Sequence, residues 1–156
     1  MSKITTFLTY ADQAEAAATL YTSVFPRSRI TQINRYGKGA PVPEGTVLTV
    51  QFELDGQPYV AMNGGSHFKF SEGISLSVSC DTQAEIDAYC DKLIAGGGKQ
   101  GPCGWLTDRF GVSWQIIPAA LPKLMGGDAA RSSRVMQALM QMQKLDLGAL
   151  QRAYEG

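Results

Sequence analysis

A chain of 156 residues, 44% of them hydrophobic, is long enough to bury the core of one domain or of two small halves. Its 14 Lys and Arg residues balance its 14 Asp and Glu residues without a run of like charge, which argues against a nucleic-acid or membrane partner. Three cysteines without C-x-x-C spacing, an N-terminus without the apolar core of a signal peptide, and no apolar run of membrane-spanning length predict a cytoplasmic protein with reduced thiols.

The chain begins with a pattern typical of a strand followed by a helix. Residues 4–10 form a β-branched and aromatic run, the composition of a strand. Asp12 is predicted to cap the next helix, because its side chain can accept from the free N–H groups of the first turn and Glu15 lies in the capping-box position. Phe25-Pro26 is predicted to end this helix.

Three strands and one long loop are predicted next. Residues 29–36 have the composition of a strand, and residues 37–45, with three glycines and two prolines, that of a loop. Residues 46–54 alternate apolar and polar side chains, as expected of a strand with one buried face. Asp55-Gly56 is a typical two-residue hairpin turn, so residues 57–63 are predicted to return as a partner strand.

After a second loop at residues 64–73, the same order of elements begins again. Residues 74–80 alternate Ile, Leu, Val and Cys with serines, which predicts another strand. Thr82 is predicted to cap a helix, with Glu85 in the capping-box position. Gly96-Gly97-Gly98 is interpreted as the end of this helix, since a phosphate-binding loop would follow a strand instead.

A hairpin is predicted over residues 103–118, with its tight turn at Phe110-Gly111. The tripeptide Gln-Ala-Glu at 13–15 recurs 70 residues later, in agreement with the repeated order of elements. We therefore interpret the chain as one domain containing two β-α-β-β-β modules, about 1–65 and about 72–118.

The remaining residues, about 119–156, are predicted to be helical. The expected helices are 120–125, 130–143 and 147–154, the last capped by Asp146. These helices carry stripes of methionine and leucine side chains. Their apolar surface is larger than the rest of one small domain is expected to bury. We therefore expect the protein to form a homodimer.

Short motifs along nearly the whole chain match one family. They are Phe25-Pro26, Ala61-Met62-Asn63-Gly64-Gly65, Phe68, Phe70, Ile74-Ser75, Cys103-Gly104-Trp105, Asp108-Arg109-Phe110-Gly111, Trp114-Gln115 and Lys144-Leu145-Asp146. With them the chain closely resembles the PhnB-like branch, often labelled 3-demethylubiquinone-9 3-methyltransferase-like, of the vicinal oxygen chelate superfamily (glyoxalase I, bleomycin-resistance proteins and extradiol dioxygenases). The resemblance implies an α+β fold in which two paired β-α-β-β-β modules form a cup-shaped mixed sheet, followed by C-terminal helices.

The resemblance also indicates where a metal ion would bind. The metal enzymes of the superfamily hold a divalent ion with His, Glu or Gln, one from each of four strands. The corresponding positions here are Thr5, a residue near Val60, Gly73 or Ser75, and Gln115. Hydroxyl and hydrocarbon side chains do not replace imidazole and carboxylate ligands, so we expect no metal site and no other cofactor.

The methyltransferase label raises a separate expectation. A methyl donor of the S-adenosyl type normally binds a doubly wound sheet, beside a glycine-rich turn that follows the first strand. The sequence shows no strand, glycine-rich turn and helix in that order. We therefore do not expect methyl transfer.

One face of the predicted strands carries hydroxyl, amide and phenyl groups. In any antiparallel sheet such a face can be solvated, whereas the resemblance makes it the lining of the cup. We expect contacts with a small molecule from this face and from the loop at 64–73. The candidate ligand-binding residues are Thr5, Phe7, Met62, Asn63, His67, Phe68, Phe70, Ser75, Ser77, Trp105 and Gln115.

The predicted function is that of a metal-independent protein that binds an apolar or aromatic small molecule. The alternative is a lyase, isomerase or oxygenase that uses a divalent metal or uses His67 as a general base, a role that histidine often has in enzymes. No carboxylate or thiol partner for His67 is visible by spacing, and nothing near Cys103 would activate it as a nucleophile. We assign no catalytic residue, and whether the chain catalyses a reaction stays open.

Overall fold

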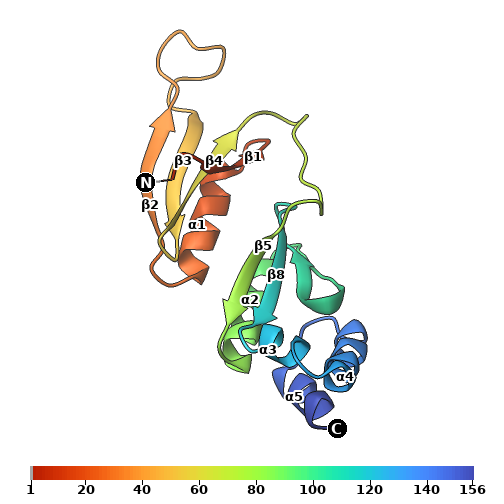
Figure 1. The fold of residues 1–156 in the computed structure, drawn as a ribbon. Coiled ribbons are helices and arrows are strands. Elements are labelled where there is room, and N and C mark those ends of the chain that lie inside the picture. The colour runs from red at the N-terminus through yellow and green to blue at the C-terminus, as the bar shows by residue number, and fades with distance from the viewer. Residues whose placement is uncertain (1) are drawn as a thin grey trace. The chain divides into compact units, whose positions relative to one another are not determined.

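The structure, a computed structural model, describes residues 2–156 and divides the chain into two compact units, with the division between Lys69 and Phe70 (Figure 1). Each unit contains a mixed four-stranded sheet that packs against a helix. The C-terminal helices belong to the second unit. The predicted α+β class, with two β-α-β-β-β modules followed by helices, is confirmed.

The first unit follows the predicted order of elements closely. Its elements are β1 (Thr6–Tyr10), α1 (Ala14–Val24), β2 (Arg29–Arg35), β3 (Val47–Leu54) and β4 (Gln57–Asn63). The strand order is β1-β4-β3-β2, with β1 parallel to β4 and the other pairs antiparallel. The predicted hairpin turn is confirmed, because Asp55 and Gly56 both have positive φ angles (49° and 80°), as a type I′ turn requires.

The alternation of β3 explains how α1 packs on this sheet. Every second residue of the strand is buried, namely Val50, Phe52 and Leu54. The facing side of α1 is largely alanine, and the small side chains of Ala14, Ala17 and Ala18 are fully buried. Small residues let a helix backbone approach a sheet closely, so a compact core forms from a short helix.

The start of α1 differs from the prediction that Asp12 caps it. The N-cap residue is Gln13, and its side chain makes no capping hydrogen bond. Instead, the Oδ1 atom of Asn63, at the end of β4, accepts a hydrogen bond from the Ala14 N–H at 2.9 Å. Glu15 pairs with Arg35 at 3.7 Å rather than with the helix backbone. The capping-box prediction is wrong here because a residue distant in sequence satisfies the first turn.

The second unit repeats the strand order of the first. Its elements are β5 (Leu76–Cys80), α2 (Gln83–Ile94), β6 (Lys99–Gln100), the 3₁₀ turn η1 (Pro102–Gly104), β7 (Trp105–Thr107), β8 (Ser113–Pro118), α3 (Leu121–Met125), α4 (Ala129–Met140) and α5 (Leu147–Glu155). The sheet order is β5-β8-β7-β6, with β5 parallel to β8, so the predicted repeat is confirmed. No helix within residues 2–156 is long and apolar enough to cross a membrane.

The cap predicted for α2 is confirmed. Thr82 Oγ1 accepts a hydrogen bond from the Glu85 N–H at 3.2 Å, and Glu85 Oε2 accepts one from the Asp81 N–H at 3.1 Å. The strand before it begins at Leu76, two residues later than predicted. Ile74 and Ser75 therefore precede β5 rather than forming part of it.

The turn between β7 and β8 depends on one buried carboxylate. Asp108 is 2% exposed, and its Oδ1 accepts hydrogen bonds from the N–H groups of Phe110 and Val112 at 2.9 and 3.0 Å. Its Oδ2 accepts a hydrogen bond from Trp114 Nε1 at 2.9 Å. Gly111 takes a φ angle of 94°, which only glycine adopts without strain. The D-x-x-G motif is thus a turn in which the aspartate also holds the indole of the following strand.

Helices α3 to α5 pack against the rest of the second unit. The buried residues of these helices and of the segment between α4 and α5 form one cluster: Leu124, Val135, Leu145 and Leu150. The N–H groups of Cys103 and Gly104 donate to the carbonyls of Met142 and Gln143 at 2.9 and 2.8 Å. A Cβ atom at Gly104 would lie 3.0 Å from the side chain of Leu145, so a glycine there makes room for the segment between α4 and α5.

A glutamine of α2 holds the same segment from the other side. Gln83 Nε2 donates to the Leu145 carbonyl at 3.0 Å, and its Oε1 accepts from the Leu147 N–H at 2.8 Å. Lys144 pairs with Asp87 at 2.9 Å, and this hydrogen bond lowers the pKa of the Asp87 carboxyl. The C-terminal helices are therefore an integral part of the second unit.

Candidate functional site

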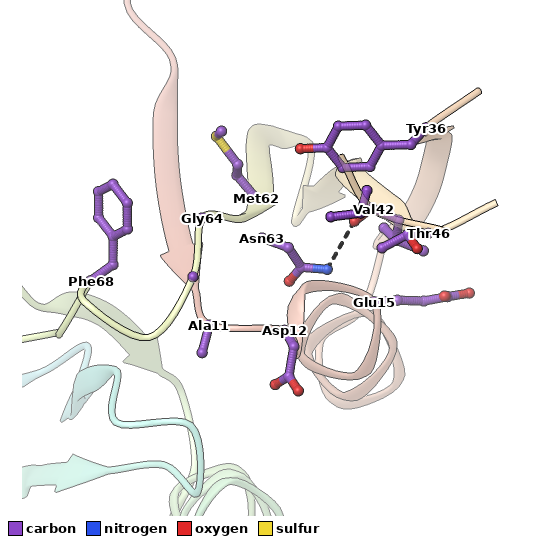
Figure 2. Close-up of a pocket in the computed structure, with 12 residues that line it drawn as sticks. Ala11, Asp12, Glu15, Tyr36, Val42, Thr46, Met62, Asn63, Gly64 and Phe68 are labelled. Atoms are coloured by element: carbon purple, nitrogen blue, oxygen red, sulfur yellow. Dashed lines mark hydrogen bonds between the residues drawn. The ribbon is translucent and has the colours of Figure 1, made fainter. Parts of the chain in front are cut away.

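The first unit contains a pocket of about 650 Å³ at the start of α1 (Figure 2). Its lining comes from residues 11–15 before and within the first turn of α1, from residues 36–47 between β2 and β3, and from residues 62–68 at and after the end of β4. All of these segments lie in the first unit. The pocket is large enough for a small organic molecule.

Asn63 positions the segments that form this pocket. Its Oδ1 accepts from the Ala14 N–H at 2.9 Å, and its Nδ2 donates to the Val47 carbonyl at 3.1 Å (Figure 2). The side-chain amide of Asn63 therefore links the end of β4 to the start of α1 and to the start of β3. Because these bonds use both polar ends of the side chain, Asn63 shapes the pocket more than it offers a contact to a ligand.

Replacement of Asn63 by alanine is expected to lower the free energy of unfolding by about 1–2 kcal/mol, since two partly buried hydrogen bonds, one of them to the first turn of α1, are lost together. Urea denaturation of the full chain measures this change. Gln51→Ala is the matched control, because Gln51 is an exposed amide on the neighbouring strand β3. Equal effects of the two substitutions would contradict the positioning role of Asn63.

Phe68 forms a wall of the pocket beside a glycine. A Cβ atom at Gly64 would lie 2.8 Å from the Phe68 ring and 2.7 Å from the Thr9 side chain, so Gly64 lets the ring lie close to the backbone. His67 is exposed, and its ring centre lies 4.5 Å from that of Phe68. Within residues 2–156, no hydrogen bond or ion pair joins His67 to a carboxylate or a thiol. His67 therefore lacks the orienting partner that a general base commonly has.

The sheet face of the first unit that lies away from α1 carries further candidate residues. Phe7 is paired with Val60, and Thr9 with Met62, so these side chains share one face of the sheet. Phe7 is 55% exposed, which is unusual for a phenylalanine in a strand. Thr5 precedes β1 and is exposed.

In the second unit, one cross-strand row brings three candidate residues together. Gln115 of β8 lies opposite Ser77 of β5 on one side and opposite Trp105 of β7 on the other. Gln115 Nε2 also donates to Ser75 Oγ at 2.8 Å. Trp114, on the opposite face, is buried. This row presents an indole, a hydroxyl and an amide oxygen side by side.

Phe70 is the remaining candidate residue of the second unit. Its side chain lies 3.8 Å from the Cβ position of Gly111, beside the turn that Asp108 holds. Among the candidate residues of the first unit, Met62, Asn63 and Phe68 line the pocket, whereas Thr5, Phe7 and His67 do not.

The side chains at the positions of the superfamily's metal ligands do not fit a divalent metal ion. The described residues contain no group of three or more His, Cys, Asp or Glu side chains arranged to hold an ion. At the corresponding positions, Gln115 bonds to Ser75, and Thr5 and Val60 offer only a hydroxyl and a hydrocarbon. We derive no catalytic step through a metal ion.

Two of the three cysteines are buried thiols. Burial raises the pKa of Cys80 to about 12 and that of Cys90 to about 11. Both side chains therefore stay protonated at neutral pH and are poor nucleophiles.

The comparisons with known proteins identify the family. The model of the family described as 3-demethylubiquinone-9 3-methyltransferase matches residues 2–117. The chain belongs to this family. Its C-terminal helices lie beyond the matched part. No curated protein matches the chain.

Solved structures of this family and fold agree with the assignment. A putative 3-demethylubiquinone-9 3-methyltransferase, a PhnB protein from Bacillus cereus, is 40% identical, with 76% of this chain and 100% of that chain covered and a TM-score of 0.67. Protein PA1353 from Pseudomonas aeruginosa is 21% identical, with 76% and 98% covered and a TM-score of 0.60. The fosfomycin resistance protein FosX from Mesorhizobium loti is 13% identical, with 75% and 92% covered and a TM-score of 0.52, a likeness of fold alone. The predicted PhnB-like branch of the vicinal oxygen chelate superfamily is thus confirmed.

Sequence reasoning missed several residues that line the pocket. They are Ala11, Asp12, Glu15, Tyr36, Val42, Thr46 and Val47. Asp12 and Glu15 were interpreted as a helix cap, because their spacing fits a capping box. The glycine-rich loop after Tyr36 was a usable signal, since loops that follow rigid strands often carry binding residues.

Proposed function

We propose that this protein binds an apolar or aromatic small molecule without a metal ion, and that the pocket at the start of α1 is the site. The observation that supports this proposal is the pocket of about 650 Å³, whose lining includes Met62, Val42 and Phe68. Apolar walls supply most of the contact energy in sites of this kind, and few polar groups are needed to orient the ligand.

Each unit also has a sheet face on the side away from its helix, and we propose each of these faces as a further contact surface. Phe7 in the first unit and the Ser77–Gln115–Trp105 row in the second present aromatic rings and neutral polar groups. Such a surface suits an apolar or aromatic molecule and offers no fixed charge to a phosphate or a carboxylate. Phe7→Ala tests the face of the first unit and Gln115→Leu that of the second, each separately from the pocket.

The experiment is a screen of small aromatic molecules by ligand-observed NMR with the full chain, in the presence of EDTA. We expect binders whose affinity falls about tenfold in Phe68→Ala, because an aromatic wall of the pocket is lost. Met140→Ala is the control, since Met140 is 64% exposed on α4 and remote in sequence from the pocket. Binding that disappears with EDTA, or that Phe68→Ala leaves unchanged, would contradict the proposal.

The rival functions have less support. A lyase, isomerase or oxygenase of the superfamily type would need the metal ligands that Thr5 and Val60 do not supply. The family description names methyl transfer, yet each sheet of the described chain has four strands with a single parallel pair. A methyl donor of the S-adenosyl type normally binds a doubly wound parallel sheet instead.

We also propose that the protein is a homodimer. Met136 and Met140 of α4 are 41% and 64% exposed, and large exposed apolar side chains often mark an interface. Light scattering at micromolar concentration is expected to give twice the chain mass of 16.8 kDa. Met136→Lys with Met140→Lys is expected to shift the protein toward monomer, and a monomer mass for the unmodified chain would overturn the assignment.

A further inference from the structure

We propose that the ligand of the pocket at the start of α1 carries a positively charged nitrogen on its apolar body, as an ammonium group beside an aromatic ring does. This inference rests on the proposed function, because it names the chemical class of the molecule that the same pocket takes. It starts from the charges in the lining.

The charged residues that line the pocket are both acidic. Asp12 and Glu15 contribute carboxylates, and no Lys, Arg or His residue belongs to the lining. Asp12 forms no ion pair with any residue in the described part of the chain. Glu15 pairs with Arg35 at 3.7 Å, and both side chains are about half exposed (47% and 48%), so this pair is weak.

The partial charge of the helix does not reverse this balance. The N-terminus of α1 carries the equivalent of about half a positive elementary charge, which by itself favours an anion. Arg35 offsets one of the two carboxylates, and the charge of the other still exceeds that half charge. Asn63 already accepts from the N–H of Ala14, the first residue of the helix. The field in the pocket is therefore negative, and it attracts cations and repels phosphates and carboxylates.

The rest of the lining suits the body of such a ligand. Figure 2 shows Asp12 and Glu15 at the start of α1, with Tyr36, Met62 and Phe68 on the surrounding segments. An aromatic ring attracts a cation through its π face as well as an apolar group through its area. The amide of Asn63 is occupied by backbone partners, so the carboxylates are the strongest polar contacts left for a ligand.

The experiment compares three probes of one shape and different charge. They are 2-(1-naphthyl)ethylamine, a cation at neutral pH, the neutral 2-(1-naphthyl)ethanol, and the anion 1-naphthylacetate. Affinities for the full chain are measured from amide chemical shifts at low and high salt. We expect the amine to bind about tenfold more tightly than the alcohol, the acid to bind most weakly, and the preference for the amine to shrink at high salt.

Charge-changing variants assign the preference to this pocket. Asp12→Asn and Glu15→Gln are each expected to weaken amine binding about three- to fivefold and to leave alcohol binding unchanged. Arg35→Gln is expected to strengthen amine binding about twofold, because it frees the carboxylate of Glu15. Asp91→Asn is the matched control, since Asp91 is an exposed acid on α2.

The outcomes separate this inference from the proposed function. If none of the three probes binds at up to about 10 mM, both proposals fail. If the alcohol binds as tightly as the amine and Phe68→Ala weakens both, the pocket is a binding site and the charge inference alone is wrong. An amine preference that Asp12→Asn and Glu15→Gln leave unchanged also overturns it.

Discussion

Replacement of Asp108 by alanine is expected to lower the free energy of unfolding of the second unit by about 3 kcal/mol. The carboxylate is buried and accepts from two backbone N–H groups and from the Trp114 indole. Alanine leaves these donors without their partner in a place that water reaches poorly. Chemical denaturation followed by tryptophan fluorescence measures the loss, and Trp114 reports on the altered turn directly.

Asp108→Asn separates the contributions of the two carboxylate oxygens. An asparagine oxygen still accepts from the N–H groups of Phe110 and Val112, whereas its NH₂ group faces the indole N–H, which is also a donor. We expect roughly half the loss seen with alanine. In a Trp114→Phe background the Asn substitution should cost less, because the opposing donor is gone. Equal costs in both backgrounds would show that the indole bond contributes nothing.

Leu145→Ala is expected to cost about 3 kcal/mol, in the range seen for leucines truncated in a packed core. Leu145 is fully buried in the cluster with Leu124, Val135 and Leu150. Its side chain also packs next to Gly104, so the cavity would open between the C-terminal helices and η1. Urea denaturation of the full chain gives the change, and the same experiment on Gln151→Ala serves as control.

The control variant is expected to change the free energy of unfolding very little. Gln151 is exposed on α5, so its truncation should leave the free energy of unfolding within about 0.5 kcal/mol of that of the unmodified protein. A loss below about 1 kcal/mol for Leu145→Ala would show that the C-terminal helices contribute little to the stability of the second unit.

Much of the fold was predictable because its signals are local. Strand β3 alternates apolar and polar side chains, and its partner β4 follows an Asp-Gly turn, so both strands and their hairpin follow from short-range sequence. The cap of α2 likewise needs only Thr82 and Glu85, three residues apart. The cap of α1 fails as a prediction because its acceptor, Asn63, is 49 residues from the N–H that it binds.

The candidate site was predictable only in part, for the same reason. Met62, Asn63 and Phe68 are close in sequence, and they line one pocket. The remaining walls come from the start of α1 and from the loop between β2 and β3, which the fold brings to the same place. The alternation of side chains along the strands places Ser77, Gln115 and Trp105 on one face of the sheet. It does not show which groups form hydrogen bonds, such as the one from Gln115 to Ser75.

The docking of the C-terminal helices has a consequence for folding during synthesis. All elements of the first unit lie within residues 2–69, so this unit can fold while the ribosome still makes the second. The second unit has the opposite property, because Gly104 binds the carbonyl of Gln143 and Gln83 holds Leu147. Its core cannot close until Leu150 has left the ribosome, and until then the site that Leu145 fills stays open to chaperones and proteases.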